Sequence, residues 1–182
     1  MVTTAKKLTC ADYEKMPADG FRHEILDGEE FMAPPPSTDH QAVVGNVFRL
    51  HANHAATRKL GRVFVAPTAV VLSLHDAVEP DVFFVSKSNA SIITSRNIQG
   101  APDLVVEVLS PSTASNDRGP KLSTYDRAGV REYWIVDPTA KTVEIREFGN
   151  TRRTRAYQDD QSFQSEAFPG LTVRLEDIFS IE

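Results

Sequence analysis

The fold is decided by the stretch Asp103-Leu104-Val105-Val106-Glu107-Val108-Leu109. Its nearly continuous apolar character is typical of a β-strand that is covered on both faces. Glu107 is the exception, and burying a lone carboxylate costs several kcal/mol. We therefore expect Glu107 to meet a cation, a metal ion or a proton. Alternation along a strand places Asp103, Val105, Glu107 and Leu109 on one face.

A second acidic residue opens another apolar run, Asp81-Val82-Phe83-Phe84-Val85, and Pro80 marks the start of that run. If the two strands are neighbours, the carboxylates of Asp81 and Glu107 converge on one site. Two oxygen ligands suit a hard cation such as Mg²⁺ or Mn²⁺. The alternatives are a structural ion pair for Glu107 and ordinary turn chemistry for the Pro-Asp pair.

The helix expected directly after the Glu107 strand supplies a basic residue. This helix runs from about Lys121 to Ala128, with Asn116 or Asp117 as its N-cap. An ammonium group at Lys121 can orient the attacking water or stabilise the transition state of a hydrolysis. The alternative for Lys121 is a solvated helix lysine.

A β-hairpin is predicted near the N-terminus, from Phe21 to Met32, because Asp27-Gly28 in its middle favours a type I′ turn. A turn of two residues pairs Leu26 with Glu29 and Glu24 with Phe31. Glu24 then lies among apolar neighbours on one face of the hairpin. It is either a second metal ligand or a charge on an edge strand.

The remaining pattern predicts an α/β fold with a mixed central sheet flanked by helices, an N-terminal and a C-terminal β-hairpin, and a single domain over residues 1–182. The other expected elements are a short helix at Leu8–Met16, a long helix at His40–Lys59 capped by Ser37, Thr38 or Asp39, strands at Val63–Ala66 and Ala69–Leu74, a hairpin of Glu132–Val136 with Thr142–Phe148, and a last helical turn at Glu176–Phe179.

Several polar residues have two interpretations. His40 either faces the carboxylate site or is simply a polar residue beside the helix cap. Asp103 shares the face of Glu107 and is interpreted as a strand-start residue. His51 and His54 lie three residues apart on the long helix, and without a third ligand we expect them on a solvated face.

The composition limits the class of protein. A net charge of -5 and a pI of about 5.6 argue against a protein that coats nucleic acid non-specifically, although a carboxylate-rich metal site is itself acidic. Arg152, Arg153 and Arg155 form the densest basic cluster, which suits either a phosphate backbone or an exposed hairpin end. The single cysteine excludes an internal disulfide. Residues 1–7 lack a secretory signal and no apolar run is long enough for a bilayer, so we expect a cytoplasmic protein without a membrane anchor.

These residues resemble the Uma2 family of endonucleases, formerly a domain of unknown function, within the PD-(D/E)XK nuclease superfamily. The resemblance spans Tyr13 to Phe179. Its specific stretches are Glu24-Ile25-Leu26-Asp27-Gly28-Glu29, Pro35-Pro36-Ser37 with His40, Pro80-Asp81, Pro102 to Ser112, then Asp117, Lys121 and Tyr125, and finally Gly129 to Pro138.

The resemblance implies a restriction-endonuclease-like core with Asp81 as the metal-binding aspartate of the Pro-Asp motif and Glu107 as the acidic residue of the next strand motif. The superfamily places a lysine two residues after that glutamate, and Leu109 stands there in this sequence. The resemblance therefore favours Lys121, in the next helix, for the basic role. Glu24 corresponds to the additional N-terminal acidic residue. The expected catalytic set is Asp81, Glu107, Lys121 and Glu24, with Asp81 and Glu107 as metal ligands.

The function implied by the resemblance is an Mg²⁺- or Mn²⁺-dependent endonuclease that hydrolyses phosphodiester bonds in DNA. The alternative hypothesis is a non-catalytic nucleic-acid-binding or regulatory protein on a degenerate nuclease scaffold, and it predicts that Lys121 points away from the carboxylates. A homodimer is expected in either case. A third hypothesis makes the strand of Trp134 a purely structural dimer interface.

Overall fold

The strand β8 (Leu104–Val108) lies in the middle of a six-stranded sheet with the order β11-β10-β9-β8-β6-β3. It pairs antiparallel with β6 (Val82–Ser86) and parallel with β9 (Glu132–Asp137), so the sheet is mixed, as predicted. The structure is a computed structural model that describes residues 6–150 and 152–180. The outer strands are β3 (Gly61–Val65), β10 (Thr142–Glu147) and β11 (Arg153–Tyr157). The predicted C-terminal hairpin is formed by β9 and β10.

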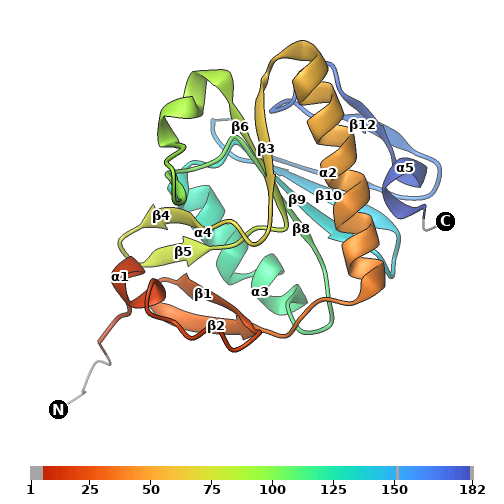
Figure 1. Cartoon of the computed structure of the whole chain (residues 1–182). Helices are drawn as coiled ribbons and strands as arrows, with labels where there is room; N and C mark the ends of the chain where they lie inside the picture. The colour runs from red at the N-terminus through yellow and green to blue at the C-terminus, as the bar shows by residue number, and fades with distance from the viewer. Residues whose placement is uncertain (1–5, 151, 181–182) are drawn as a thin grey trace.

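The long helix α2 (Thr38–Arg58) covers one face of this sheet (Figure 1). Val43, Val44 and Val47 of α2 pack against alternate residues of the central strands, including Val106 and Trp134. Ser37 is the N-cap, because its hydroxyl accepts a hydrogen bond from the His40 N–H, and the helix ends at Lys59 in a left-handed conformation. The same core is closed by β12 (Ser162–Gln164), β13 (Thr172–Arg174) and α5 (Leu175–Phe179).

The opposite face of β8 packs against α4 (Pro120–Ala128) and against a second sheet with the order β2-β1-β5-β4-β7. In Figure 1, α3 and α4 lie between the strands of the two sheets. The second core contains Val105 of β8, Tyr125 of α4 and Leu26 of β1. The strands of the second sheet are β1 (Arg22–Leu26), β2 (Glu29–Ala33), β4 (Val70–Ser73), β5 (Asp76–Val78) and β7 (Ile98–Gln99), and the short elements nearby are α1 (Cys10–Tyr13) and the 3₁₀ helix η1 (Lys87–Ile92).

The predicted hairpin is formed by β1 and β2, with Leu26 opposite Glu29 and Glu24 opposite Phe31. Asp27 and Gly28 both have positive φ, 49° and 79°, as a type I′ turn requires. The two-residue loop thus fixes the register that turns Arg22, Glu24 and Leu26 to the same side.

The predicted cap of α4 is wrong. Asn116 and Asp117 belong to a separate short helix, α3 (Ala114–Arg118), and α4 begins after Gly119 with Pro120 in its first turn. Proline suits this position because it lacks the N–H that would have no partner there. The predicted end of the helix at Gly129 is confirmed by its φ of 89°.

Trp134 cannot provide a dimer interface, because its side chain is fully buried in the core below α2. Its indole N–H donates to the buried carboxylate of Glu132, which also accepts the backbone N–H groups of Glu166 and Ala167. Tyr133 is buried on the opposite face. The hypothesis of an interface built on this strand is therefore wrong, because both faces of β9 are already covered.

No helix within residues 6–150 and 152–180 is long and apolar enough to cross a membrane. The expectation about a secretory signal rests on residues 1–7, of which 1–5 lie outside the described part of the chain.

His51 does not lie on a solvated face as predicted. It is buried edge-on against Trp134 and Phe168, and its Nδ1 donates to the Val47 carbonyl at 2.8 Å. Its other ring nitrogen, Nε2, is buried without a hydrogen-bond partner. Burial lowers the pKa of His51 to about 4, because the apolar surroundings penalise the charged ring.

This lowered pKa predicts a loss of stability in acid. An unfolded chain protonates His51 below about pH 6.5, whereas the folded chain resists protonation until the pKa of His51, about 4, is reached. Between pH 7 and pH 4, the free energy of unfolding of wild type should therefore fall by about 3 kcal/mol relative to that of His51→Phe. Urea unfolding at several pH values measures this difference. Val47→Ala is the control: its free energy of unfolding should differ from that of wild type by the same amount at every pH. A difference between His51→Phe and wild type that is also independent of pH would contradict the prediction.

Candidate active site

Asp81 and Glu107 meet across the boundary between β6 and β8. The pairing of Val82 with Val106 continues one step further and sets Asp81 opposite Glu107. Both side chains are buried, and the Asp81 N–H reaches Oε2 of Glu107 at 3.4 Å. The Val108 N–H donates to Oδ2 of Asp81 at 2.9 Å. Asp81 itself lies in the link from β5 to β6, so the site forms where the chain passes from one sheet to the other.

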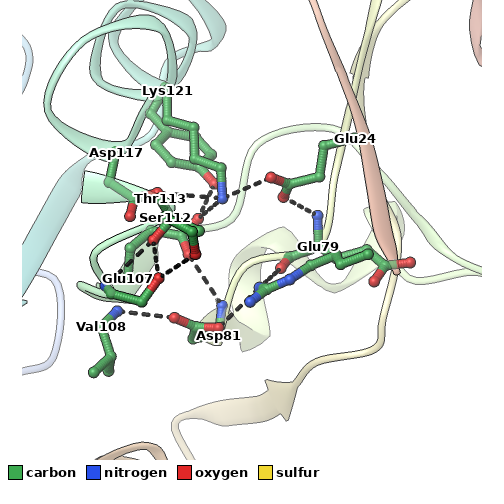
Figure 2. A network of polar contacts seen from close by, with 12 residues as sticks. Glu24, Glu79, Asp81, Glu107, Val108, Ser112, Thr113, Asp117 and Lys121 are labelled. Carbon is green, nitrogen blue, oxygen red and sulfur yellow. Dashed lines mark hydrogen bonds and ion pairs between the residues drawn. The ribbon is translucent and has the colours of Figure 1, made fainter. Parts of the chain in front are cut away.

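Lys121 points into this site and is not a solvated helix lysine. Its side chain comes from the first turn of α4 and is only 2% exposed. Figure 2 shows its ammonium group between carboxylates from different elements. The Nζ atom lies 2.9 Å from Oε1 of Glu107 and 2.9 Å from Oε2 of Glu24, with Asp117 at 3.5 Å. The non-catalytic hypothesis predicted the opposite orientation.

Glu107 is almost completely buried, at 1% exposed. Burial raises its pKa, and the charges of Asp81 and Asp117 act in the same direction, while Lys121 opposes the shift. The Tyr125 hydroxyl donates to Oε1 at 2.6 Å, beside the Lys121 contact. The Oε2 atom accepts only the long bond from Asp81 among the described residues. One oxygen is thus held firmly, and the other is free to take a further partner.

Asp81 is held by two basic side chains. The Arg22 NH1 group donates to Oδ1 at 2.8 Å and also to the Glu79 carbonyl, and His40 Nε2 lies 3.3 Å from Oδ2. Burial opposes ionisation of Asp81, but the His40 hydrogen bond and the Arg22 charge together lower its pKa to about 2. His40 also donates to the Val108 carbonyl at 2.8 Å. The structure therefore brings His40 into the site, and not merely beside the helix cap.

Glu24 is not an edge-strand charge, because β1 lies between β2 and β5 and the side chain is buried. Its Oε1 accepts the Glu79 N–H at 2.8 Å, while Oε2 faces Lys121 (Figure 2). Asp117, expected as a helix cap, joins the same cluster. Burial raises the pKa of Asp117, and its Oδ1 atom is buried without a hydrogen bond.

Three site residues were given no role in the site by the sequence interpretation: Arg22, Asp117 and Tyr125. A signal for Arg22 was available, because alternation places it on the face of Glu24 at the start of the hairpin. For Asp117, only the spacing of four residues to Lys121 could have helped, since residues four apart on a helix share a face. The break between α3 and α4 concealed that relation.

The charges of the cluster do not balance. Four buried carboxyl groups, those of Glu24, Asp81, Glu107 and Asp117, face two permanently cationic side chains, Arg22 and Lys121. The excess of two negative charges matches the charge of one divalent cation. Protonation of carboxyl groups such as Glu107 is the other way to relieve it.

The residues fit a hard divalent cation. Asp81 and Glu107 present oxygens on adjacent strands, and Glu107 Oε2 retains acceptor capacity. In the described ranges, no three His, Cys, Asp or Glu side chains are arranged as a complete metal cage. Magnesium does not need such a cage, because it is typically held by one or two carboxylates with waters and substrate phosphates. The site can therefore hold Mg²⁺ or Mn²⁺ when substrate supplies the remaining oxygens.

Two other candidate groups lie outside the site. Asp103, as interpreted, is a strand-start residue: its Oδ2 accepts the Ser86 N–H at 2.8 Å. The arginine cluster sits on and beside the edge strand β11, three strands away from β8. Arg152 pairs there with Asp126, and Arg155 pairs with Glu147. Neither group contacts Asp81 or Glu107.

A family model described as a putative restriction endonuclease, Uma2, matches residues 10–176. The chain belongs to the Uma2 family. Among relatives of this Uma2 protein, an uncharacterized protein of Synechocystis sp. is 26% identical over 147 residues, which cover 79% of this chain and 82% of that protein. The crystal structure of a putative nuclease belonging to DUF820 from Anabaena variabilis superimposes with a TM-score of 0.80 at 19% identity, over 94% of this chain and 97% of that one. This likeness confirms the predicted fold class.

The Uma2 site predicts that removal of the Lys121 ammonium is costly. Lys121→Met leaves Glu107, Glu24 and Asp117 without their shared cation, so the free energy of unfolding should fall by about 3–5 kcal/mol. Urea unfolding in the presence of a chelator measures the loss. Lys87→Met, at an exposed lysine, is the control and should change stability by less than about 0.5 kcal/mol.

The double variant Lys121→Met/Glu107→Gln tests whether the two side chains act as a pair. Removing the charge of Glu107 should recover part of the loss, with a coupling energy above about 1 kcal/mol. If the losses of unfolding free energy are strictly additive, the contact at 2.9 Å between Lys121 and Glu107 contributes no coupling energy.

Proposed function

We propose that this protein is a divalent-metal-dependent endonuclease that hydrolyses phosphodiester bonds in DNA, with Mg²⁺ or Mn²⁺ as its cofactor. The observation that carries the proposal is the position of Lys121, whose ammonium group lies 2.9 Å from Glu107 although Leu109 occupies the usual place of the lysine. The family description and the nuclease-like neighbour support a nuclease in the broader sense. Restriction-endonuclease-like families generally use divalent metal ions.

Asp81 and Glu107 are the residues that would hold the metal ion. When bound there, a divalent cation lowers the pKa of a coordinated water and offsets the charge that develops on the phosphate. The low pKa of Asp81, about 2, keeps this carboxylate ionised and ready to bind at neutral pH. A cation bound there would also favour the ionised form of Glu107, whose pKa burial raises.

Lys121 and Arg22 are the two cationic side chains of the site, and each has its own role in the proposed reaction. Lys121 is buried and fixed by three carboxylates, so its ammonium group can orient the attacking water without having to reorganise. Arg22 is less buried than Lys121, binds Asp81 through NH1, and lines two surface cavities beside that residue. A guanidinium group in this position suits a phosphate oxygen. Water adds to phosphorus, one P–O bond breaks, and the strand is left with a phosphate at one end and a hydroxyl at the other.

This geometry argues against the non-catalytic alternative. That alternative was based mainly on the leucine at position 109, and Lys121 now lies beside Glu107 instead. Burying a lysine beside three carboxylates is costly for the fold, and a site that has lost its function would not be expected to keep it. The proposal retains the homodimer and the cytoplasmic location expected from the sequence, with an interface that does not involve the buried Trp134.

The proposal predicts metal-dependent cleavage of DNA that depends on both carboxylates. Asp81→Asn and Glu107→Gln should each lower the cleavage rate about 100-fold or more in Mg²⁺ or Mn²⁺, because the charge that holds the cation is removed. Asp103→Asn is the matched control, since Asp103 is buried on the same face of the β8 segment but lies outside the cluster.

Far-UV circular dichroism of each variant shows whether the fold is retained, and calorimetry reports metal binding separately from cleavage. Folded wild-type protein that cleaves no single-stranded or duplex DNA in either metal would refute the proposed activity. Equal rates for Asp81→Asn and Asp103→Asn would refute the assignment of the site.

A further inference from the structure

A cavity of about 310 Å³ opens directly beside the proposed catalytic site. Asp81 and Arg22, which contact each other at 2.8 Å, form one part of its wall. The other lining residues come from segments that are far apart in the sequence: the approach to β1, the Pro34–Pro36 link with the first turns of α2, the end of β3 with Pro67, and Glu79. Whatever fills this cavity therefore lies next to the group that the catalytic residues act on.

Much of the remaining wall is apolar and open to solvent. Phe21 is 48% exposed and Val65 is 36% exposed, and they are two of the four large apolar side chains that are exposed in the described part of the chain. The Pro34–Pro36 link and Pro67 add rigid apolar surface between them. An exposed aromatic ring within such a hollow is typical of a binding site, and nucleobases stack on aromatic rings of this kind.

The cavity also offers polar groups that suit the edge of a base. The side-chain amide of Gln41 lines it and makes no hydrogen bond within the described ranges. The carboxylate of Glu79 is held by the Tyr13 hydroxyl at 2.6 Å and retains acceptor capacity. An amide can both donate to and accept from a base, and a carboxylate can accept from an exocyclic amine.

A second, smaller cavity of about 160 Å³ shares Arg22 and the Pro34–Pro36 link with the first. Its far wall is Ser110 to Thr113, whose hydroxyl groups suit a phosphate or a sugar. Arg22 thus stands between an apolar hollow and a hydroxyl-lined hollow. This arrangement matches one nucleotide, with its base on the Phe21 side and its phosphate at Arg22.

The size of the first cavity suits a single base and not a base pair in a duplex. The volume of the first cavity is at the small end of ligand sites, and a base must leave its stack to enter it. Arg22 is the one cationic side chain in its lining, whereas duplex binding rests on many phosphate contacts. The net charge of -5 is consistent with recognition that depends on stacking more than on phosphates.

We propose that the cavity of Phe21, Val65 and Gln41 binds one unpaired nucleobase next to the scissile phosphate, so that this protein acts on single-stranded or locally unpaired DNA in preference to intact duplex. This inference rests on the proposed nuclease function, and it adds the class of substrate. Phe21 is its main contact and a determinant of specificity.

The test compares cleavage of one oligonucleotide sequence as a single strand and as a duplex, in Mn²⁺, by the full chain. Wild type should have a kcat/KM at least 10-fold higher on the single strand. Phe21→Ala should lose about 10-fold on the single strand, mainly through KM, with little change on the duplex, and Phe21→Trp should restore the preference. Met32→Ala is the matched control, because Met32 is 52% exposed on the same hairpin and does not line the cavity.

A single strand with an abasic nucleotide beside the cleaved bond separates base binding from a structural effect. On this substrate wild type and Phe21→Ala should be equal, because the base that Phe21 contacts is absent. Equal cleavage of single strand and duplex by wild type, or a Phe21→Ala loss that persists on the abasic strand, would overturn the inference.

Fluorescence anisotropy with the same strands, carrying a label, distinguishes failure of the base-binding inference from failure of the proposed nuclease function. Tighter binding of the single strand that depends on Phe21, without any hydrolysis, would support the base site and count against the nuclease. Hydrolysis of both forms with no effect of Phe21→Ala would support the nuclease and reject the base site.

Discussion

The contact between Lys121 and Glu107 is the interaction on which the rest of the site depends. A carboxylate in the middle of a fully covered strand needs a counter-charge, and α4 delivers one from the face opposite α2. The same ammonium group reaches Glu24 of the second sheet and Asp117 of α3. One cation thus joins four separate elements, and a change in the position of any of them leaves a buried charge without its partner.

Burying this many charges is costly for the fold, and such clusters are found at functional sites. An apolar core at these positions would be at least as stable, because buried ion pairs seldom stabilise a fold relative to well-packed apolar residues. The cluster instead has an excess of negative charge, one carboxylate with a lowered pKa at Asp81, and one with a raised pKa at Glu107. Neighbouring carboxylates whose pKa values are pushed apart are characteristic of catalytic sites. Two cavities adjoin the cluster, and Arg22 lines both of them.

Local patterns in the sequence predicted the strands that carry the site and the hairpin that carries Glu24. Apolar runs located β6 and β8, and the Asp27-Gly28 turn specified the register that turns Glu24 inward. The roles of Arg22 and Asp117 were not predicted, because both depend on how the two sheets and α3 pack together, and no periodicity within one segment encodes that. His51 was misjudged for the same reason: its neighbours Trp134 and Phe168 come from distant parts of the chain.

The central claim is that Asp81 and Glu107 hold one divalent cation while Lys121 stays beside Glu107. The most direct measurement is a crystal structure of the full chain grown with Mn²⁺, with anomalous diffraction data that locate the ion. The account predicts one anomalous peak between the two carboxylates, with the Lys121 ammonium still in contact with Glu107. Absence of a peak at saturating Mn²⁺, or a Lys121 side chain turned away from Glu107, would contradict it.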